Sequence, residues 1–294
     1  MKTFTIGKKK IVLKEEWMVG FITTWIVGLL AHAYRFFNFL PIWDSIYNFT
    51  GVGSTYTLGR WFLGYAGLIT SMFDLPWVNG AFSLFYISIV VILLTEMFEI
   101  KNKGMIVLCA AIFVSFPTVV SSFAYMYTAD AYLLAFLLAT LAVYLTWCVK
   151  KWGTIAGMVC LAFAMGIYQA YATVAIVLVL LYIIRQFVIE KLDFLEAVRK
   201  DLKYLGMLVG GAVLYAVILK ITLIRYNITL PGYQGIGALG IMSLGGTAKD
   251  AVSFQTDPWY GTWCGKTRLF LIKCSGIVAD RTDLNISFST QSGL

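Results

Sequence analysis

Long apolar runs, separated by short clusters of lysine and arginine, dominate this chain. A helix needs about 20 apolar residues to cross the hydrocarbon core of a membrane. Runs of this kind occupy residues 17–37, 80–98, 105–123, 131–149 and 204–223. The pattern therefore predicts an all-α polytopic membrane protein.

Two further apolar segments are ambiguous in length. Residues 62–73 are too few for a comfortable span, and residues 153–184 are enough for two helices joined by a tight turn at residues 166–169. If the first segment does not cross and the second crosses twice, every basic cluster falls on one side, as the positive-inside rule requires. We therefore expect about seven transmembrane helices and a cytoplasmic N-terminus. A long first outer loop, residues 38–79, would contain a short re-entrant or interfacial helix at 62–73.

The apolar pattern ends after Leu223. Residues 1–225 would form one transmembrane domain, and residues 226–294 would form a glycine-rich segment and a polar tail. This outline is what a truncated C-terminal region would give.

Composition narrows the classes of function. Apolar types make up 60% and charged types 13% of the chain, against roughly half and a quarter in soluble domains. The net charge of +8 lies in clusters between apolar runs, which predicts contact with membrane lipids and no nucleic-acid partner. Because no glycine-rich nucleotide loop is present, a bound sugar donor would be lipid-linked rather than nucleotide-linked.

Charged side chains near a membrane cost free energy to place, so each one needs a reason. The predicted topology places Asp44 and Arg60 on the outer side. Asp44 could accept a proton from an acceptor hydroxyl, or it could be a solvated aspartate that caps a short helix. Arg60 could hold a phosphate through paired hydrogen bonds, or it could extend to lipid headgroups.

Other polar residues are expected at the same depth. Asp130 would cap the fourth helix, and a cap can also help to bind substrate. Tyr125 and Tyr127 lie just before it. Gln169 and Tyr171 could hydrogen-bond a sugar, although a turn at the membrane interface would use the same residues.

Three short motifs carry a resemblance to a known family. They are Trp43-Asp44, Gly59-Arg60-Trp61-Phe62, and Ser122-Phe123-Ala124-Tyr125 with Thr128-Ala129-Asp130. Together with the lysine-bearing N-terminus and the first helix, they resemble the membrane glucosyltransferases that modify O-antigen in serotype conversion. The resemblance covers roughly residues 10 to 225.

The resemblance implies a C-type glycosyltransferase fold in the bacterial inner (cytoplasmic) membrane. Such an enzyme moves a hexose, here glucose, from a polyprenyl-phosphate carrier to a lipid-linked O-antigen or related surface glycan on the outer face. It also implies that Asp44 is catalytic, that Arg60 binds the donor phosphate, and that Asp130 serves the acceptor or a divalent metal. No other cofactor is implied.

Two alternatives stay open. The chain could be a transporter or flippase of lipid-linked sugars, or a truncated inactive relative. A transporter would place ionisable residues at mid-membrane depth and break helices in two matching halves. Here the acidic residues fall at helix ends and no halves match, so the pattern favours glycosyl transfer.

Overall fold

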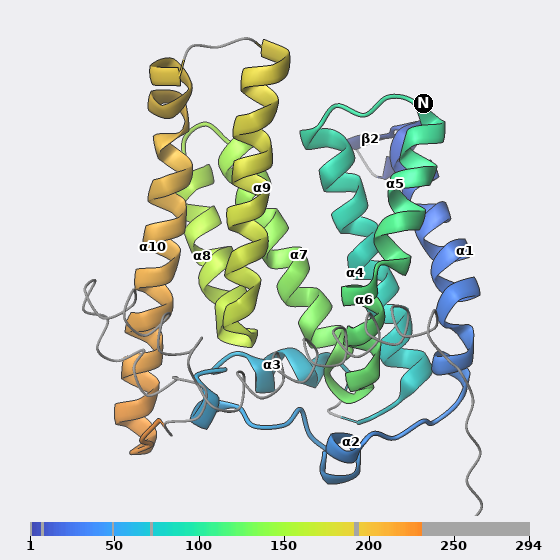
Figure 1. Ribbon diagram of the computed structural model, residues 1–294, viewed down its shortest axis with the longest axis vertical. Coiled ribbons are helices and arrows are strands. Elements are labelled where there is room, and N and C mark those ends of the chain that lie inside the picture. The colour runs from blue at the N-terminus through green and yellow to red at the C-terminus, as the bar shows by residue number, and fades with distance from the viewer. Residues whose placement is uncertain (1, 7–8, 49, 71–72, 191–193, 231–294) are drawn as a thin grey trace, which may run out of the picture. The chain divides into compact units, whose positions relative to one another are not determined.

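A computed structural model describes residues 2–6, 9–48, 50–70, 73–190 and 194–230 (Figure 1). The long helices are α1 (Glu15–Phe37), α4 (Pro76–Met97), α5 (Lys103–Ser115), α7 (Met126–Cys148), α8 (Gly153–Ile167), α9 (Ala172–Arg185) and α10 (Phe194–Tyr226). The short helices are α2 (Trp43–Tyr47), α3 (Leu63–Gly67) and α6 (Pro117–Ser122). Single turns are η1 (Tyr56–Leu58), η2 (Leu68–Thr70), η3 (Phe123–Tyr125), η4 (Gln169–Tyr171) and the π-helical η5 (Gln186–Glu190). The predicted tail lies outside the described residues, apart from 226–230.

The helical character of the predicted apolar runs is confirmed, and it indicates a membrane protein. Among the described residues, five helical segments are long and apolar enough to cross a membrane, and α8 is a shorter apolar helix. Every predicted apolar run coincides with helix in the structure. The exact number of seven spans stays a prediction, because residues 103–148 form one apolar segment and α8 has only 15 residues.

The predicted single helix at 105–123 is wrong in one respect. The structure divides it into α5 and α6 at Phe116, whose backbone is extended (φ −64°, ψ 140°), and Pro117 opens α6. A proline disfavours the helical conformation in the residue before it and provides no backbone N–H. The break therefore follows directly from Pro117.

The predicted turn at 166–169 is confirmed. Helix α8 ends at Ile167, Tyr168 is extended, and η4 leads into α9. By contrast, α10 begins ten residues before the apolar run of 204–223 and continues for 33 residues. A helix that extends beyond the hydrocarbon core can continue with charged residues, and the apolar pattern does not mark its end.

A two-stranded antiparallel hairpin precedes α1 and was not predicted. It consists of β1 (Lys2–Ile6) and β2 (Lys9–Leu13), with Lys2 opposite Leu13 and Ile6 opposite Lys9. The β-branched residues of this stretch favour strands.

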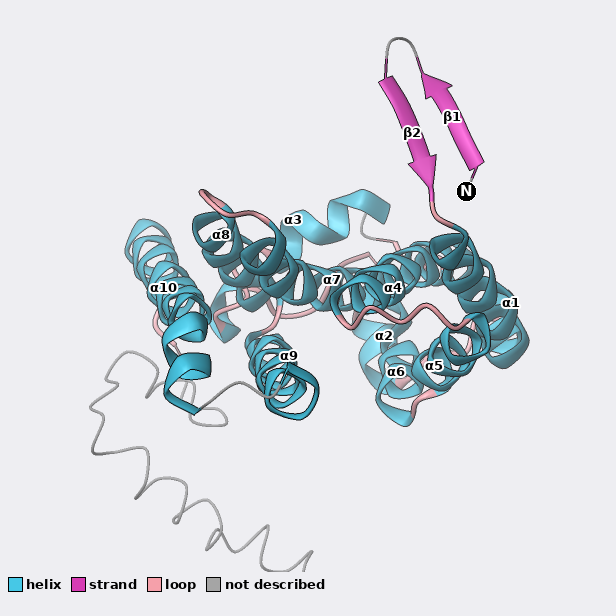
Figure 2. Cartoon of the chain, turned by 90° about the horizontal axis from the view of Figure 1, so that it is seen from above, coloured by secondary structure: helices cyan, strands magenta, loops and turns pink. Residues whose placement is uncertain are grey.

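Helix α7 lies between two packed groups of helices (Figure 2). Ala129, Leu133 and Leu137 face the cluster that includes side chains of α4 and α5. Ala135 and Ala139 belong to the cluster that includes α8 and α9. Small side chains allow membrane helices to approach closely, so α7 can serve as the common wall of both groups.

The long first loop stays at one end of the bundle. The chain leaves α1 and enters α4 at the same end, where α2 and α3 lie below the long helices (Figure 1). Phe62 N donates to Gly166 O at 2.8 Å, which fixes the middle of the loop to the end of α8. The re-entrant or interfacial character of residues 62–73 stays a prediction.

Candidate functional site

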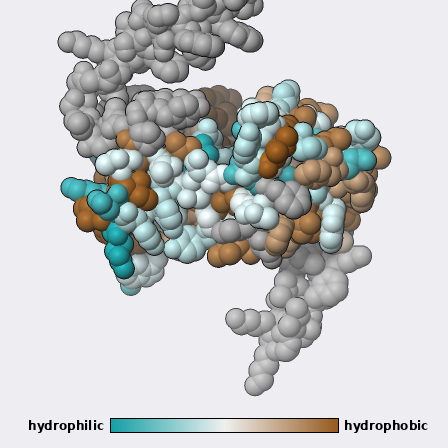
Figure 3. Space-filling view, turned by 90° about the horizontal axis from the view of Figure 1, so that it is seen from below, coloured by the Kyte–Doolittle hydropathy of each residue, from teal (hydrophilic) through white to brown (hydrophobic). Residues whose placement is uncertain are grey.

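The sequence-predicted candidates gather at the end of the bundle that carries α2, α3, η3 and η4, here called the loop end. Seen from below, this end shows pale residues of intermediate hydropathy between brown apolar patches (Figure 3). A surface of this kind can meet both lipid and a polar substrate.

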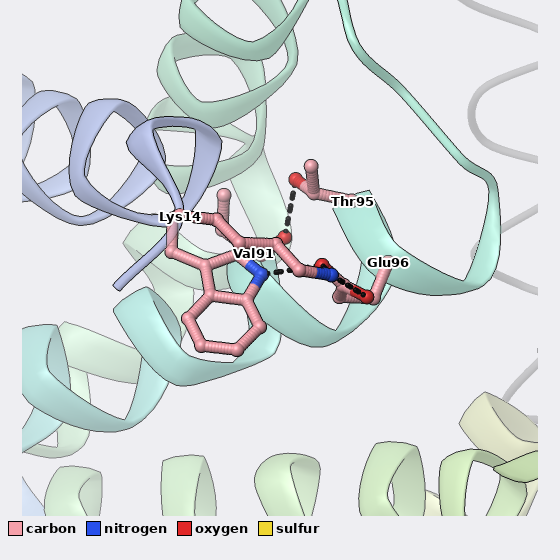
Figure 4. Close-up of polar contacts among 5 residues, drawn as sticks. Lys14, Val91, Thr95 and Glu96 are labelled. Carbon is pink, nitrogen blue, oxygen red and sulfur yellow. Dashed lines mark hydrogen bonds and ion pairs between the residues drawn. The ribbon is translucent and has the colours of Figure 1, made fainter. Parts of the chain in front are cut away.

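At the opposite end of the bundle, charged side chains form ion pairs between helices. Lys14 Nζ forms an ion pair with Glu96 at 2.6 Å, and Trp17 Nε1 donates to the same carboxylate, which joins the start of α1 to α4 (Figure 4). Two more ion pairs lie there, Lys103 with Glu15 and Arg185 with Glu99. Within the described part of the chain, the charged residues of the loop end form no such pair.

Arg60 is positioned by a clamped turn. Gly59 has φ +71°, a left-handed conformation that glycine adopts without strain. Gln169 Nε2 donates to Leu58 O at 2.8 Å and to the Tyr215 hydroxyl at 2.9 Å. The Tyr215 hydroxyl in turn donates to Gly59 O at 3.0 Å. Gln169 therefore stabilises the turn that carries Arg60. The sequence predicted that this residue would bind sugar, whereas its amide group here binds the protein itself.

The guanidinium of Arg60 lies among tyrosines. Its Nη1 donates to the Tyr132 hydroxyl at 3.2 Å, and its Cζ lies 4.6 Å from the centre of the Tyr168 ring. The rings of Tyr132 and Tyr168 stack at 5.4 Å, and Tyr171 lies 6.1 Å from Tyr168. Nε of Arg60 is buried and has no hydrogen-bond partner among the described residues. The tyrosines therefore hold the Arg60 guanidinium in place, and its Nε–H is not used in a hydrogen bond to the described residues.

Tyr127 is a buried residue near the start of α7, and its hydroxyl lies within the electrostatic influence of both Asp44 and Arg60. Asp44 lies in the first turn of α2 and is exposed, with Ile42 as the N-cap of that helix. The interpretation of Asp44 as the cap of α2 is therefore wrong. Tyr125 is 42% exposed and lies 6.5 Å from Tyr127, ring to ring.

Asp130 does not join this group. Helix α7 begins at Met126 with Tyr125 as its N-cap, so the predicted capping role of Asp130 is wrong. The cause is the turn η3, which continues directly into α7 and starts the helix earlier than the apolar pattern indicated. Asp130 and Tyr132 are two residues apart and so point about 200° apart around the helix. The carboxylate is 2% exposed and accepts a hydrogen bond from Thr70 Oγ1 at 3.0 Å.

A second buried carboxylate belongs to Asp74, which precedes α4. It is 4% exposed, and its Oδ1 accepts no hydrogen bond from the described residues. Burial raises the pKa of this carboxyl, and the positive charge of Arg35 partly opposes the shift. Arg35 itself donates to the carbonyls of Phe123 and Ala124 at 2.9 and 3.0 Å, which ties α1 to η3.

Divalent-metal binding at the loop end stays a prediction. Over the described ranges, no three Asp, Glu, His or Cys side chains come together. A magnesium ion can bind through one or two carboxylates when substrate phosphates and water complete its ligands. Asp130 accepts a hydrogen bond from Thr70, and Asp44 is exposed on α2.

Sequence reasoning missed three tyrosines, Tyr132, Tyr168 and Tyr215. Tyr168 was placed in the predicted turn beside Gln169, and its position was the available signal. Tyr132 and Tyr215 lie inside apolar runs, where a tyrosine looks like any other membrane residue. Only the packing of α7 and α10 against the loop gives them partners.

Comparison with known protein families gives a match over most of the chain. The family model of glucosyl transferase GtrII matches residues 33–255, which is more than half of the chain. No curated protein and no solved structure matches. The matched range includes the whole loop end, from the last turn of α1 to the end of α10. The chain therefore belongs to the glucosyl transferase GtrII family, the family of O-antigen serotype-conversion glucosyltransferases.

Proposed function

We propose that the loop end transfers glucose from a polyprenyl-phosphate carrier to a lipid-linked O-antigen or related surface glycan. In this proposal the loop end faces the outside of the bacterial cytoplasmic membrane and the N-terminus faces the cytoplasm. One observation supports it most. Arg60 is a partly buried cation whose contacts are tyrosines, with no carboxylate paired to it among the described residues.

The phosphate of the donor supplies the negative charge that no described carboxylate provides to Arg60. Guanidinium groups bind phosphate oxygens through charge-assisted, often paired, hydrogen bonds. Negative charge grows on the carrier phosphate as its bond to the sugar breaks, so a fixed cation stabilises the transition state more than the ground state. Tyr132 and Tyr168 hold the guanidinium in place, and Tyr171 extends the aromatic wall beside them.

Asp44 acts as the base in this mechanism. The acceptor hydroxyl oxygen bonds to C1 of the glucose, and the bond from C1 to the phosphate oxygen breaks. The electron pair leaves with the polyprenyl phosphate, and the hydroxyl proton passes to the Asp44 carboxylate. Tyr127 lies within the electrostatic influence of both Asp44 and Arg60, and its ring is 6.5 Å from the ring of Tyr125, so the sugar would occupy the neighbourhood of these two tyrosines. Gln169 and Asp130 are positioning residues, because their polar groups already bind protein partners.

The test uses the purified protein in lipid nanodiscs, with polyprenyl-phosphate glucose and lipid-linked glycan from the host membrane. Arg60→Ala should lower kcat/KM by roughly 10- to 100-fold, since a hydrogen bond to a charged group contributes about 1.5–3 kcal/mol. Arg60→Lys should retain part of the activity, because lysine keeps the positive charge but cannot form the paired hydrogen bonds of a guanidinium. Arg225→Ala, an exposed arginine near the end of α10, is the matched control and should be active.

Asp44→Asn should abolish transfer at an unchanged protein level, whereas Glu196→Gln, an exposed carboxylate of α10, should not. Mass spectrometry of the product should show one added hexose. Full activity in Arg60→Ala and Asp44→Asn would remove both residues from the mechanism. Movement of lipid-linked sugar across vesicles without a new glycosidic bond would instead favour a transporter.

A further inference from the structure

A hollow of about 370 Å³ lies in the first loop, next to the candidate site. One stretch of chain, residues 51–68, supplies its wall. Its lining residues include Gly51, Gly53, Thr55, Tyr56, Gly64 and Tyr65. Its volume falls in the range of about 300–1,000 Å³ that is typical of small-ligand sites.

The lining combines bare backbone with two tyrosines. An added Cβ at Gly51 would meet no atom within 4 Å, and one at Gly64 would meet only Thr55 Cγ2, at 3.9 Å. Tyr65 is 54% exposed, and its ring stacks on Phe62, which leaves the rest of it accessible. A flat ring with a hydroxyl at its edge can cover the C–H face of a pyranose and also bond its hydroxyls.

The hollow is preformed. Tyr56 stacks on Tyr226 at 5.0 Å, which fixes its ring to the end of α10. Burial, with a further contribution from the Tyr65 hydroxyl, raises the pKa of Tyr56 to about 12. Gly53, another lining residue, has φ +81°. A rigid site avoids the ordering cost that binding would otherwise carry.

The hollow shares its structure with the proposed donor site. Arg60 N donates to Thr55 O at 2.9 Å, so one turn carries both the guanidinium and a wall of the hollow. A Cβ on Gly53 would lie 3.7 Å from the ring of Tyr127, a residue within the electrostatic influence of both Asp44 and Arg60. A sugar in the hollow would therefore lie beside the place where the new glycosidic bond is proposed to form.

We infer that this hollow is a saccharide-binding subsite for the acceptor glycan, with Tyr65 as its stacking platform and Tyr56 and Thr55 as hydrogen-bonding groups. The inference rests on the proposed function for the identity of the acceptor. Binding of an oligosaccharide to the hollow can be tested without any transfer reaction.

The main test adds a bulky side chain to the lining of the hollow. Gly51 lines it, and a Cβ there would meet no atom within 4 Å, so Gly51→Leu can be introduced without a clash. Gly206→Leu places the same side chain at an equally unobstructed glycine of α10. In nanodiscs with polyprenyl-phosphate glucose, Gly51→Leu should raise the acceptor KM at least tenfold and leave the donor KM unchanged. Gly206→Leu should match the wild type. An unchanged acceptor KM in Gly51→Leu would overturn the subsite while leaving glucosyl transfer intact.

A second test separates stacking from hydrogen bonding and does not need catalysis. The probe is the soluble oligosaccharide released by mild acid from the host surface glycan, and binding to the wild type is followed by saturation-transfer NMR. Tyr65→Ala should abolish the signal, while Tyr65→Phe, which keeps the ring, should retain most of it. Equal signals in wild type and Tyr65→Ala contradict the proposal, as does displacement of the probe by phospholipid headgroups alone. If the wild type binds the probe but forms no glycosidic bond, the proposed function fails and the subsite stands.

Discussion

Gly59→Ala perturbs the turn on which the candidate site depends. The residue has φ +71°, and an added Cβ would lie 2.7 Å from Gln169 Nε2 and 2.9 Å from the Tyr215 hydroxyl. Real Cβ atoms are essentially never found this close to another heavy atom. Either the backbone must leave the left-handed region or the two clamping side chains must move away.

The size of the effect follows from these two costs. A non-glycine residue in the left-handed region costs about 1–2 kcal/mol. Displacement of Gln169 and Tyr215 weakens three hydrogen bonds, those to Leu58 O and Gly59 O and the one between the two side chains. Each contributes about 0.5–1.5 kcal/mol. We expect Gly59→Ala to lower the free energy of unfolding by roughly 2–5 kcal/mol, allowing for non-additivity among neighbours.

Chemical unfolding in mixed detergent micelles, followed by tryptophan fluorescence, measures this change. Gly206→Ala is the control, since its Cβ would enter open space on an exposed helix position. It should be neutral or stabilise by up to about 1 kcal/mol, the difference in helix propensity. If Gly59→Ala unfolds like the wild type and keeps its activity, the clamped turn is not what positions Arg60.

Further variants test Asp74, the Thr70–Asp130 hydrogen bond and the Lys14–Glu96 ion pair. Asp74→Asn should flatten the pH dependence of stability. Burial raises the pKa of Asp74 above its ordinary value of 3.8, so its contribution is complete below 3.8 and is lost as pH rises through the raised pKa. The thermal midpoint of Asp74→Asn should therefore rise relative to that of the wild type between pH 4 and pH 8. A difference between the two midpoints that stays constant over this range would contradict the prediction. Thr70→Val should lower the free energy of unfolding by about 1–3 kcal/mol, because it leaves Asp130 Oδ2 without this hydrogen bond. In a double-mutant cycle, Thr70→Val combined with Asp130→Asn should lower the free energy of unfolding by less than the sum of the two single changes. Glu96→Gln should lower the free energy of unfolding by about 1 kcal/mol, and added salt should reduce this effect because Lys14 is partly exposed. An unchanged free energy of unfolding would mean that the ion pair does not stabilise the protein.

The apolar pattern predicted most of the fold because a membrane imposes one simple demand on sequence. A span must be apolar along its length, and basic clusters mark one side. The turn after Ile167 was found because a second constraint, segment length, required it. The break at Pro117 and the early start of α7 were missed. Both depend on local backbone conformation, which an apolar run does not encode.

The candidate site was predicted less completely. The predicted order of spans and loops placed Asp44, Arg60 and Tyr127 at one end of the helix bundle, where the structure has them. It could not decide the direction around a helix. Asp130 lies at the same end and faces away from Tyr132. Rotational position depends on helix packing, and α7 packs on both sides through small residues that carry little directional signal.

The turn at residues 55–60 links the two proposals and makes them separable. Its backbone supplies one wall of the hollow at Thr55, and its end carries Arg60. Gly51→Leu changes the lining of the hollow at a residue outside this turn, so it should affect the acceptor KM alone. Gly59→Ala moves the turn itself and should therefore weaken donor and acceptor binding together, in addition to lowering stability. A Gly59→Ala protein that loses only acceptor affinity would mean that Arg60 is held by Tyr132 and Tyr168 independently of the turn.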